Sequence, residues 1–261
     1  MSRQTIADNS SLTVWQTETL RLTAFPSPSA RIVNPTWWAD IVGEPPENKI
    51  SRPKEGIHQE EGPFAQGKLV VSVQPTRVDW LFTPIIDPKR EDTNVPIIGT
   101  FSEALDRFLS LMLRWFEFDT CPPVQRLAFG AILLQPVEDR QDGYRRIAEY
   151  LPSVKLDPDG SSSDFAYQIN RPRNSTSGIT GLRINRFSKW SVASWRSTQI
   201  SLGPAAPVGY FLGPEYFACR LELDINTSPD FQGELHREQL PRIFQELVNL
   251  GREIAIKGDI P

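Results

Sequence analysis

The spacing of apolar residues predicts a chain that mixes strands and helices. From Gly67 to Pro84, apolar and polar residues alternate on both sides of a Gln-Pro-Thr-Arg sequence, which is the period-two pattern of a β-hairpin. From residue 100 to 118, apolar positions recur every three or four residues, and Thr100 with Glu103 forms a capping box at the start. This pattern predicts a long helix. Its expected core face is Leu105, Phe108, Leu109, Met112, Trp115 and Phe116.

The same periodicities predict the other elements. The apolar sequence from Val124 to Val137 is expected to be a central strand. Further strands are expected at residues 14–25, 165–173, 181–192 and 216–227, and further helices at 35–43, 142–151 and 239–254. The polar stretch at residues 47–63 is expected to be an exposed loop, with His58 solvated within it.

The order of these elements predicts an α+β fold in which helices cover an antiparallel sheet, as a single domain over residues 1–261. The sequences RLTAF at Arg21 and RLAFG at Arg126 are similar, and a short helix follows each. We therefore consider an internal duplication of a β-α-β-β-α unit, with pseudo-repeats at 12–119 and 123–256. Chance similarity between two generic α+β halves is the alternative.

Composition adds limits on compartment and partner. The chain is 39% hydrophobic and 23% charged, as is ordinary for a soluble protein. Cys121 and Cys219 are isolated in the sequence, which favours a reducing compartment. The first residues are polar, unlike a signal peptide, and no apolar run is long enough for a membrane helix. We expect a cytoplasmic protein that does not bind membranes. A net charge of −4 gives no overall nucleic-acid signature.

Several stretches resemble a sporadically distributed, uncharacterised family of bacterial α+β proteins of similar length. The similarity begins at GKLVVSVQPTRVDWLF, continues through FSEALDRFLSLML, VQRLAFGAILLQPV and YRRIAEYLPSV, and ends at RLELDINT and the closing helix. In that family the central strand usually resembles RLxxRYINR and the strand before the last helix LDID. Here the first reads RLAFGAILLQ and the second LDIN. The resemblance implies the fold and brings no activity.

The most uneven feature of the chain is a basic segment. Residues 165–214 contain no Asp or Glu and carry six Lys or Arg, so the remainder of the chain stands at −10, the difference between −4 and +6. The segment also repeats Ile-Asn-Arg, at Ile169–Arg171 and at Ile184–Arg186. Its candidate partner- or anion-binding residues are Arg171, Arg173, Arg183, Arg186, Lys189, Trp190 and Arg196.

Four explanations of this segment are open. Its bases can pair with acids elsewhere in the chain, meet a protein partner, bind nucleic acid through interleaved Arg and Trp side chains, or hold a small anion. A hairpin that turns at residues 175–177 would bring Arg171 close to Arg183. Strand alternation would place Arg173 with Arg171, and Arg186 on the face opposite Arg183.

Two further pairs of residues are candidates. Trp37 and Trp38 begin a short helix, where adjacent side chains point about 100° apart. One of the two could therefore anchor a partner. Packing of both in the core is the simpler interpretation. Glu222 and Asp224 share one face of a strand and could hold Mg²⁺, although Leu221, Leu223 and Ile225 facing the core would leave them facing water.

Catalytic signatures are otherwise lacking in the sequence. It contains no GxSxG, no phosphate-binding GxxxxGK[ST] loop and no HExxH, and it has only two histidines. We expect no cofactor and no metal.

The resulting hypothesis is a non-enzymatic binding or assembly module of a cytoplasmic bacterial multi-protein system with a protein partner. Phage defence is the setting suggested by the sporadic distribution of the family. The alternatives are a nucleic-acid-binding component that uses residues 165–214, and a metal-dependent hydrolase centred on Glu222 and Asp224.

Overall fold

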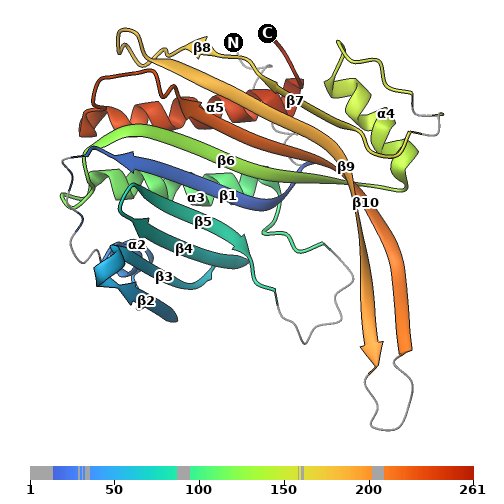
Figure 1. Cartoon of the computed structure of the whole chain (residues 1–261), viewed down its shortest axis with the longest axis horizontal. Helices are drawn as coiled ribbons and strands as arrows, with labels where there is room; N and C mark the ends of the chain where they lie inside the picture. The colour runs from blue at the N-terminus through green and yellow to red at the C-terminus, as the bar shows by residue number, and fades with distance from the viewer. Residues whose placement is uncertain are drawn as a thin grey trace.

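The computed structural model describes residues 14–28, 30, 32, 36–86, 95–157, 159, 162–201 and 209–261, and only the backbone at 197–201 and 209–211. The first half holds β1 (Gln16–Pro26), α2 (Trp37–Val42), β2 (Asn48–Arg52), β3 (Ile57–Phe64), β4 (Gly67–Gln74), β5 (Arg77–Pro84) and α3 (Phe101–Glu117). The second half holds β6 (Val124–Val137), α4 (Arg140–Tyr150), β7 (Ala166–Asn170), β8 (Arg173–Asn174), β9 (Arg183–Ser201), β10 (Gly209–Thr227) and α5 (Leu240–Lys257). Figure 1 shows their arrangement.

All strands join one antiparallel sheet, so the predicted α+β class is confirmed. The sheet has ten strands in the order β2-β3-β4-β5-β1-β6-β10-β9-β7, with β8 paired to β9. β6 lies between β1 and β10, as expected for a central strand. No helix of the described residues is long and apolar enough to cross a membrane.

The two halves occupy the sheet in the same way. In each, the first strand lies at the middle of the sheet, a short helix follows, and the last helix of the half packs on the sheet. β1 and β6, which begin the halves, are antiparallel neighbours with Ala24 opposite Leu127. Each half also holds two strands beyond the expected β-α-β-β-α unit: β2 and β3 pair with each other, whereas β7 and β8 both pair with β9. The duplication itself stays a prediction.

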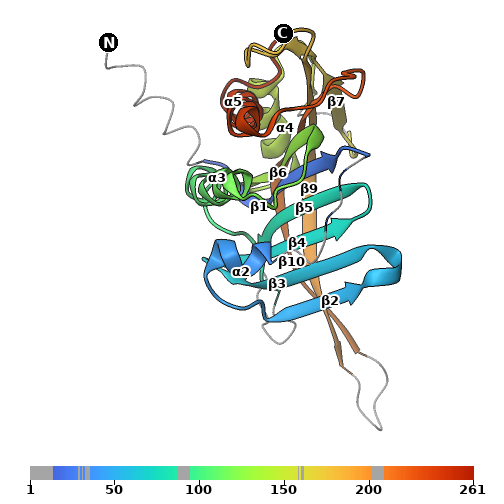
Figure 2. The same cartoon turned by 90° about the vertical axis from the view of Figure 1, so that its left-hand side faces the viewer.

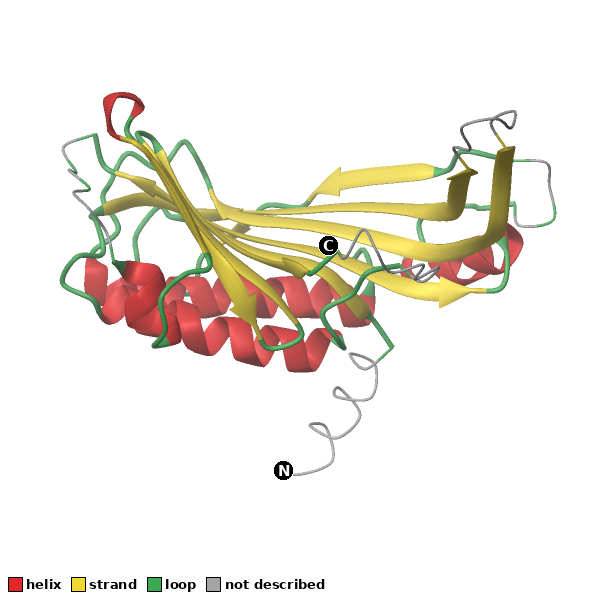
Figure 3. Cartoon of the chain, turned by 90° about the horizontal axis from the view of Figure 1, so that it is seen from below, coloured by secondary structure: helices red, strands yellow, loops and turns green. Residues whose placement is uncertain are grey.

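The helices cover one side of the sheet (Figures 2 and 3). In α5, a Cβ added at Gly251 would lie 2.9 Å from the ring of Phe129 and 3.6 Å from Leu223. Phe129 and Phe244 also stack edge to face, 6.1 Å apart. The odd-numbered positions of β6 and of the part of β10 paired with it therefore face the helices. The even-numbered positions face the other side, which the helices leave uncovered and which we call the open face.

The longest predicted elements are confirmed. The hairpin of β4 and β5 places Leu69 opposite Phe82 on the helix side. In α3, the Thr100 side chain accepts a hydrogen bond from the Glu103 backbone N–H, as the capping box predicts. Of the expected core face of α3, Leu105, Phe108, Met112, Trp115 and Phe116 are buried, whereas Leu109 is only partly buried.

The prediction of a loop at residues 47–63 is wrong, because the stretch forms β2 and β3 at the edge of the sheet. Because the stretch is mostly polar, its sequence lacks the alternation of apolar and polar residues that predicts a strand. Glu60 occupies a helix-side position of β3 and is 3% exposed. The carboxylate lies 2.9 Å from the Lys49 amine, whose charge compensates for its burial, and 3.2 Å from His58 Nε2. His58 is therefore a strand residue, and its side chain is only 13% exposed.

The two ends of the described chain meet in the core. Trp15, just before β1, is fully buried and donates a hydrogen bond from its indole nitrogen to the Ala255 carbonyl of α5 at 2.9 Å. The Trp15 ring also packs against Trp190 and Tyr150. The first strand is thus held by the last helix.

Candidate functional site

The repeated Ile-Asn-Arg sequences place their two polar residues on opposite sides of the sheet. The Arg171 backbone N–H donates to the Arg186 carbonyl at 3.2 Å, so the two repeats lie beside one another. Arg186 is opposite Ile225, a buried residue on the helix side, whereas Asn185 is opposite Asn226 on the open face. The expected neighbourhood of Arg171 and Arg183 is therefore wrong, because Arg183 pairs with Asn174 instead.

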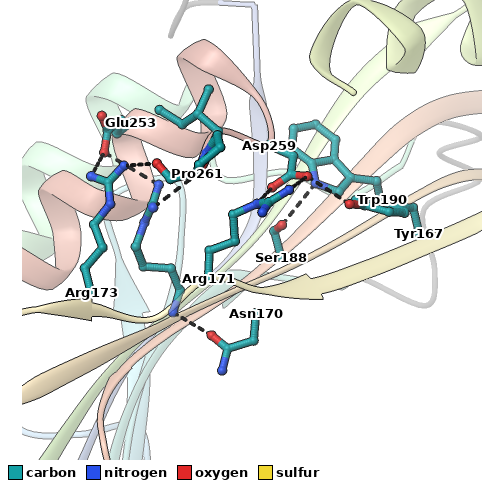
Figure 4. Close-up of polar contacts among 11 residues, drawn as sticks. Tyr167, Asn170, Arg171, Arg173, Ser188, Trp190, Glu253, Asp259 and Pro261 are labelled. Atoms are coloured by element: carbon teal, nitrogen blue, oxygen red, sulfur yellow. Dashed lines mark hydrogen bonds and ion pairs between the residues drawn. The ribbon is translucent and has the colours of Figure 1, made fainter. Parts of the chain in front are cut away.

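On the helix side, Arg171 binds a carboxylate from the end of the described chain (Figure 4). Its Nε and one terminal nitrogen donate to the two oxygens of Asp259, at 2.5 and 2.8 Å. The Tyr167 hydroxyl donates to the same carboxylate at 2.8 Å. Asp259 is 5% exposed, and the hydrogen bonds from Arg171 hold the pKa of its carboxyl below the usual value.

The neighbouring arginines contact α5 and the segment after it. Arg173 donates to Glu253 at 3.0 Å and to the Pro261 carbonyl at 2.6 Å. Arg186 is 2% exposed, lies 3.6 Å from Glu253, and has its pKa lowered mainly by burial. Arg171, Arg173 and Arg186 therefore share acids supplied from residues 253–259, and they reach those acids from the helix side.

Of the other candidates in the basic segment, Arg183 and Lys189 are on the open face, Arg196 lies farther along β9, and Trp190 is on the helix side. Lys189 pairs with Glu222 at 3.0 Å, and Arg196 with Glu215 at 2.8 Å. Arg183 is exposed and makes no ion pair with any residue that the structure describes. Trp190 is fully buried and donates to the Ser188 hydroxyl. A surface partner therefore cannot stack on Trp190 in this structure.

Trp37 and Trp38 are both buried, each only 1% exposed, so neither side chain is available as a surface anchor. Because they point about 100° apart, they meet different neighbours. Trp37 packs edge to face on Trp115 of α3 and donates to the Thr120 hydroxyl. Trp38 donates to the Leu69 carbonyl on the sheet. Helix α2 is thus buried on both of the sides that its two tryptophans occupy, one against α3 and the other against the sheet.

The centre of the open face holds an arginine and an aspartate on either side of a glycine. Arg21 of β1 and Asp224 of β10 are both directly opposite Gly130 of β6. A Cβ added at Gly130 would lie 3.1 Å from Arg21 Nε, so the guanidinium occupies the space that a side chain would fill. One Arg21 nitrogen lies 3.9 Å from Asp224 Oδ2, and the two side chains are 37% and 44% exposed.

A notch of about 260 Å³ lies at this place on the open face. Its lining is Thr19, Arg21, Leu81, Gly130, Ala131, Ile132, Phe187, Glu222, Leu223 and Asp224. Phe187 of β9 is directly opposite Asp224, and Ile132 is directly opposite Glu222. The notch therefore combines apolar walls with one arginine and two acids, and Arg21 and Asp224 face each other across its floor.

Hydrogen bonds and ion pairs surround this notch. Glu222 accepts from both Lys189 and Arg220, so its charge is neutralised. Asp224 accepts only from the Asn226 amide, at 3.1 Å, among the described residues, and Arg21 Nε is buried without a hydrogen-bond partner in the same residues. Asp224 therefore has acceptor capacity left over, and the terminal nitrogens of the partly exposed Arg21, unlike its buried Nε, are the donors that can meet a bound group.

Sequence reasoning named Asp224, and noticed Phe187 as an aromatic residue among the bases of residues 165–214, but missed Arg21 and Gly130. A glycine at the middle of an apolar central strand was the available signal, because it weakens a strand unless another group approaches closely there. Arg21 gave no signal, since only the strand order brings it to the same place as Asp224 and Phe187.

The acids of β10 and the two thiols are the remaining candidates for chemistry. Glu222 and Asp224 share the open face as expected, yet no group of three or more His, Cys, Asp or Glu side chains in the described ranges could hold a metal ion. Cys121 and Cys219 are buried, and burial raises the pKa of each thiol to about 12. Neither thiol is a nucleophile at neutral pH, because the thiolate is the reactive form.

No protein-family model matches this chain, and no curated protein matches its sequence.

Proposed function

We propose that this chain is a non-enzymatic binding module that takes a protein partner on the open face of its sheet, as one subunit of a bacterial assembly. The observation that carries the proposal is the notch above Gly130, where apolar walls surround an incompletely paired Arg21 and Asp224. A cytoplasmic location and a role in phage defence stay predictions from the sequence.

The chemistry of the notch suits a peptide or an amide side chain. Arg21 offers hydrogen-bond donors, and Asp224 offers acceptors 3.9 Å away. An amide has a carbonyl that accepts and an N–H that donates, so it can satisfy both residues at once. Phe187 and Ile132 provide the wall for an adjacent apolar group. Hot-spot residues of a partner typically insert into small clefts of this kind on partly apolar surfaces.

The charge pattern of the open face favours a protein over a nucleic acid. Phosphate backbones require several unpaired Lys or Arg side chains in a row. Here the acids Glu222 and Asp224 lie among the bases Arg21, Arg220 and Lys189, and most of these groups are paired. A mixed surface instead selects a partner by complementary charge and shape.

Capture of partners from a lysate of the native host tests the proposal. Phe187→Arg removes one apolar wall of the notch, and Gly130→Ala narrows its floor, because the added Cβ lies 3.1 Å from Arg21 Nε. Gly130→Ala should leave stability within about 1 kcal/mol of the wild type, since alanine favours the strand and Arg21 is free to move. We expect both variants to lose the captured protein by a factor of ten or more.

Ile86→Arg is the matched control, because Ile86 is 74% exposed and lies outside the notch lining. It should capture the partner as the wild type does. Unchanged capture by both notch variants would refute the proposal. Capture that requires nucleic acid in the lysate and declines steeply with salt would favour the nucleic-acid alternative instead.

A further inference from the structure

The distal part of the β9–β10 hairpin leaves the sheet. β9 pairs with β7 only as far as Ser191, and β10 pairs with β6 only as far as Phe217. Beyond these points, the two strands pair only with each other among the described residues. We call this part, Trp195–Ser201 with Gly209–Tyr216, the arm. Figures 1 and 2 show it running alone beyond the body of the molecule.

The arm contributes little to the core. The corresponding hairpin of the first half, β4–β5, turns after eight-residue strands and stays in the sheet. In the arm, Leu212 is 64% exposed, and Trp195 and Tyr216 lie opposite one another, each only half-buried. A two-stranded ribbon in water is marginally stable on its own. Pairing with a further strand would stabilise it.

The arm is electrically neutral. Its charges are Arg196 and Glu215, which are directly opposite and form an ion pair at 2.8 Å. No residue from Ser197 to Pro214 carries a charge in the sequence. Phosphate binding therefore has no basis here. A two-fold interface, by contrast, favours neutrality, because the same patch of each copy meets that patch of the other, and a net charge on it would repel its own copy.

The edge of β9 suits such a contact better than the edge of β10. β9 runs without proline from Val192 to Ser201, and beyond Ser191 its outer edge pairs with no strand of the described residues. β10 carries Pro214 at a register shift between Leu212 and Glu215, which interrupts regular pairing. An unpaired, regular strand edge is a template for another strand.

We propose that the arm is a dimerisation element whose occupant is the arm of a second copy. The β9 edges of two copies pair antiparallel, which makes a four-stranded ribbon with the two β10 strands on its outside. Such a ribbon exceeds the three strands that a sheet needs for independent stability. The contact leaves the notch on the open face free, so it is independent of the proposed partner there.

Light scattering during size exclusion, repeated over a hundredfold range of concentration, measures the mass in solution. The wild type should show twice the mass of the chain at the upper concentrations. In the shortened variant, residues 197–214 are replaced by Asn-Gly, which forms a tight turn between the opposed Arg196 and Glu215. It should be monomeric throughout while keeping the urea midpoint of the wild type, because the arm lies outside the core.

A charge series tests the pairing without removing the arm. Glu215→Arg gives each arm two positive charges, so the dimer should weaken at least tenfold at low salt and recover partly at high salt. The double variant Arg196→Glu/Glu215→Arg restores an ion pair and neutrality, and should dimerise as the wild type does. A monomeric wild type at every concentration, or a shortened variant that stays dimeric, would overturn the proposal. Arm-dependent flotation of a monomeric wild type with neutral phosphatidylcholine vesicles would overturn it in favour of a membrane surface.

Discussion

Asn170 and Asn185, the middle residues of the two Ile-Asn-Arg sequences, lie side by side on the open face. The Asn170 side chain donates to Asn185 at 3.1 Å, and Asn185 in turn donates to Asn226 on β10 at 3.1 Å. The Asn170 side-chain oxygen also accepts from the Arg186 backbone N–H at 2.9 Å. The repeat therefore builds an amide ladder on one face of the sheet and an arginine cluster on the other.

The arginine cluster makes Asp259 a stabilising residue. Asp259→Asn removes the charge that Arg171 binds and one acceptor for Tyr167, and should lower the free energy of unfolding at pH 7 by about 1–3 kcal/mol. Because Asp259 has a lowered pKa in the folded protein, its contribution is present above the unfolded pKa, near 3.9, and is lost as pH decreases through the folded pKa. The difference between wild type and variant should thus shrink below about pH 4.

Urea unfolding at several pH values between 3 and 7 measures this difference. Asp157→Asn is the matched control, because Asp157 is exposed, and it should change stability by less than about 0.5 kcal/mol. A difference for Asp259→Asn that stays constant down to pH 3 would contradict the assigned role of its ion pair.

Helix α3 should respond unequally to truncation at adjacent positions. Phe108 is fully buried, whereas Leu109 is only partly buried. Phe108→Ala should cost about 3–5 kcal/mol by leaving a cavity, and Leu109→Ala about 1–2 kcal/mol, because less apolar area is lost. Chemical unfolding of both variants provides the comparison. Equal losses would contradict the orientation of the helix.

The two thiols should resist labelling in the folded protein. With the pKa raised to about 12 in each, roughly one molecule in ten thousand carries a thiolate at pH 8. A chromogenic disulfide should react slowly with the native chain and rapidly after addition of urea. Ser153→Cys adds an exposed thiol and should add one prompt equivalent. Prompt reaction of two equivalents in the native wild type would contradict the burial of Cys121 and Cys219.

Periodicity was sufficient for elements whose buried faces are apolar. It located α3 and the β4–β5 hairpin, because Phe108 or Val71 identifies the core side without knowledge of any other element. It failed for β3, because Glu60 occupies a core-side position and is compensated by Lys49 on the next strand. Such a position becomes recognisable only when the strand pairing is known.

The candidate site was harder to predict than the fold because its residues meet only through strand order. Arg171 and Arg186 attracted notice as bases without nearby acids, yet their acids, Glu253 and Asp259, come from the end of the described chain. Arg21 and Asp224 lie on strands at opposite ends of the sequence and are brought together by β6. The local sequence around these residues therefore predicts neither of these contacts.

The hydrogen bond from Trp15 to Ala255 spans 240 positions of the chain. During synthesis, β1 leaves the ribosome long before α5 exists, and until then the Trp15 indole has no acceptor there. The part of the core around Trp15 consequently closes only after α5 has been made, and until then its apolar side chains lack their partners, at a stage when unpaired strands aggregate readily. Contacts this distant in sequence also slow folding, so this chain should depend on chaperones more than its size suggests.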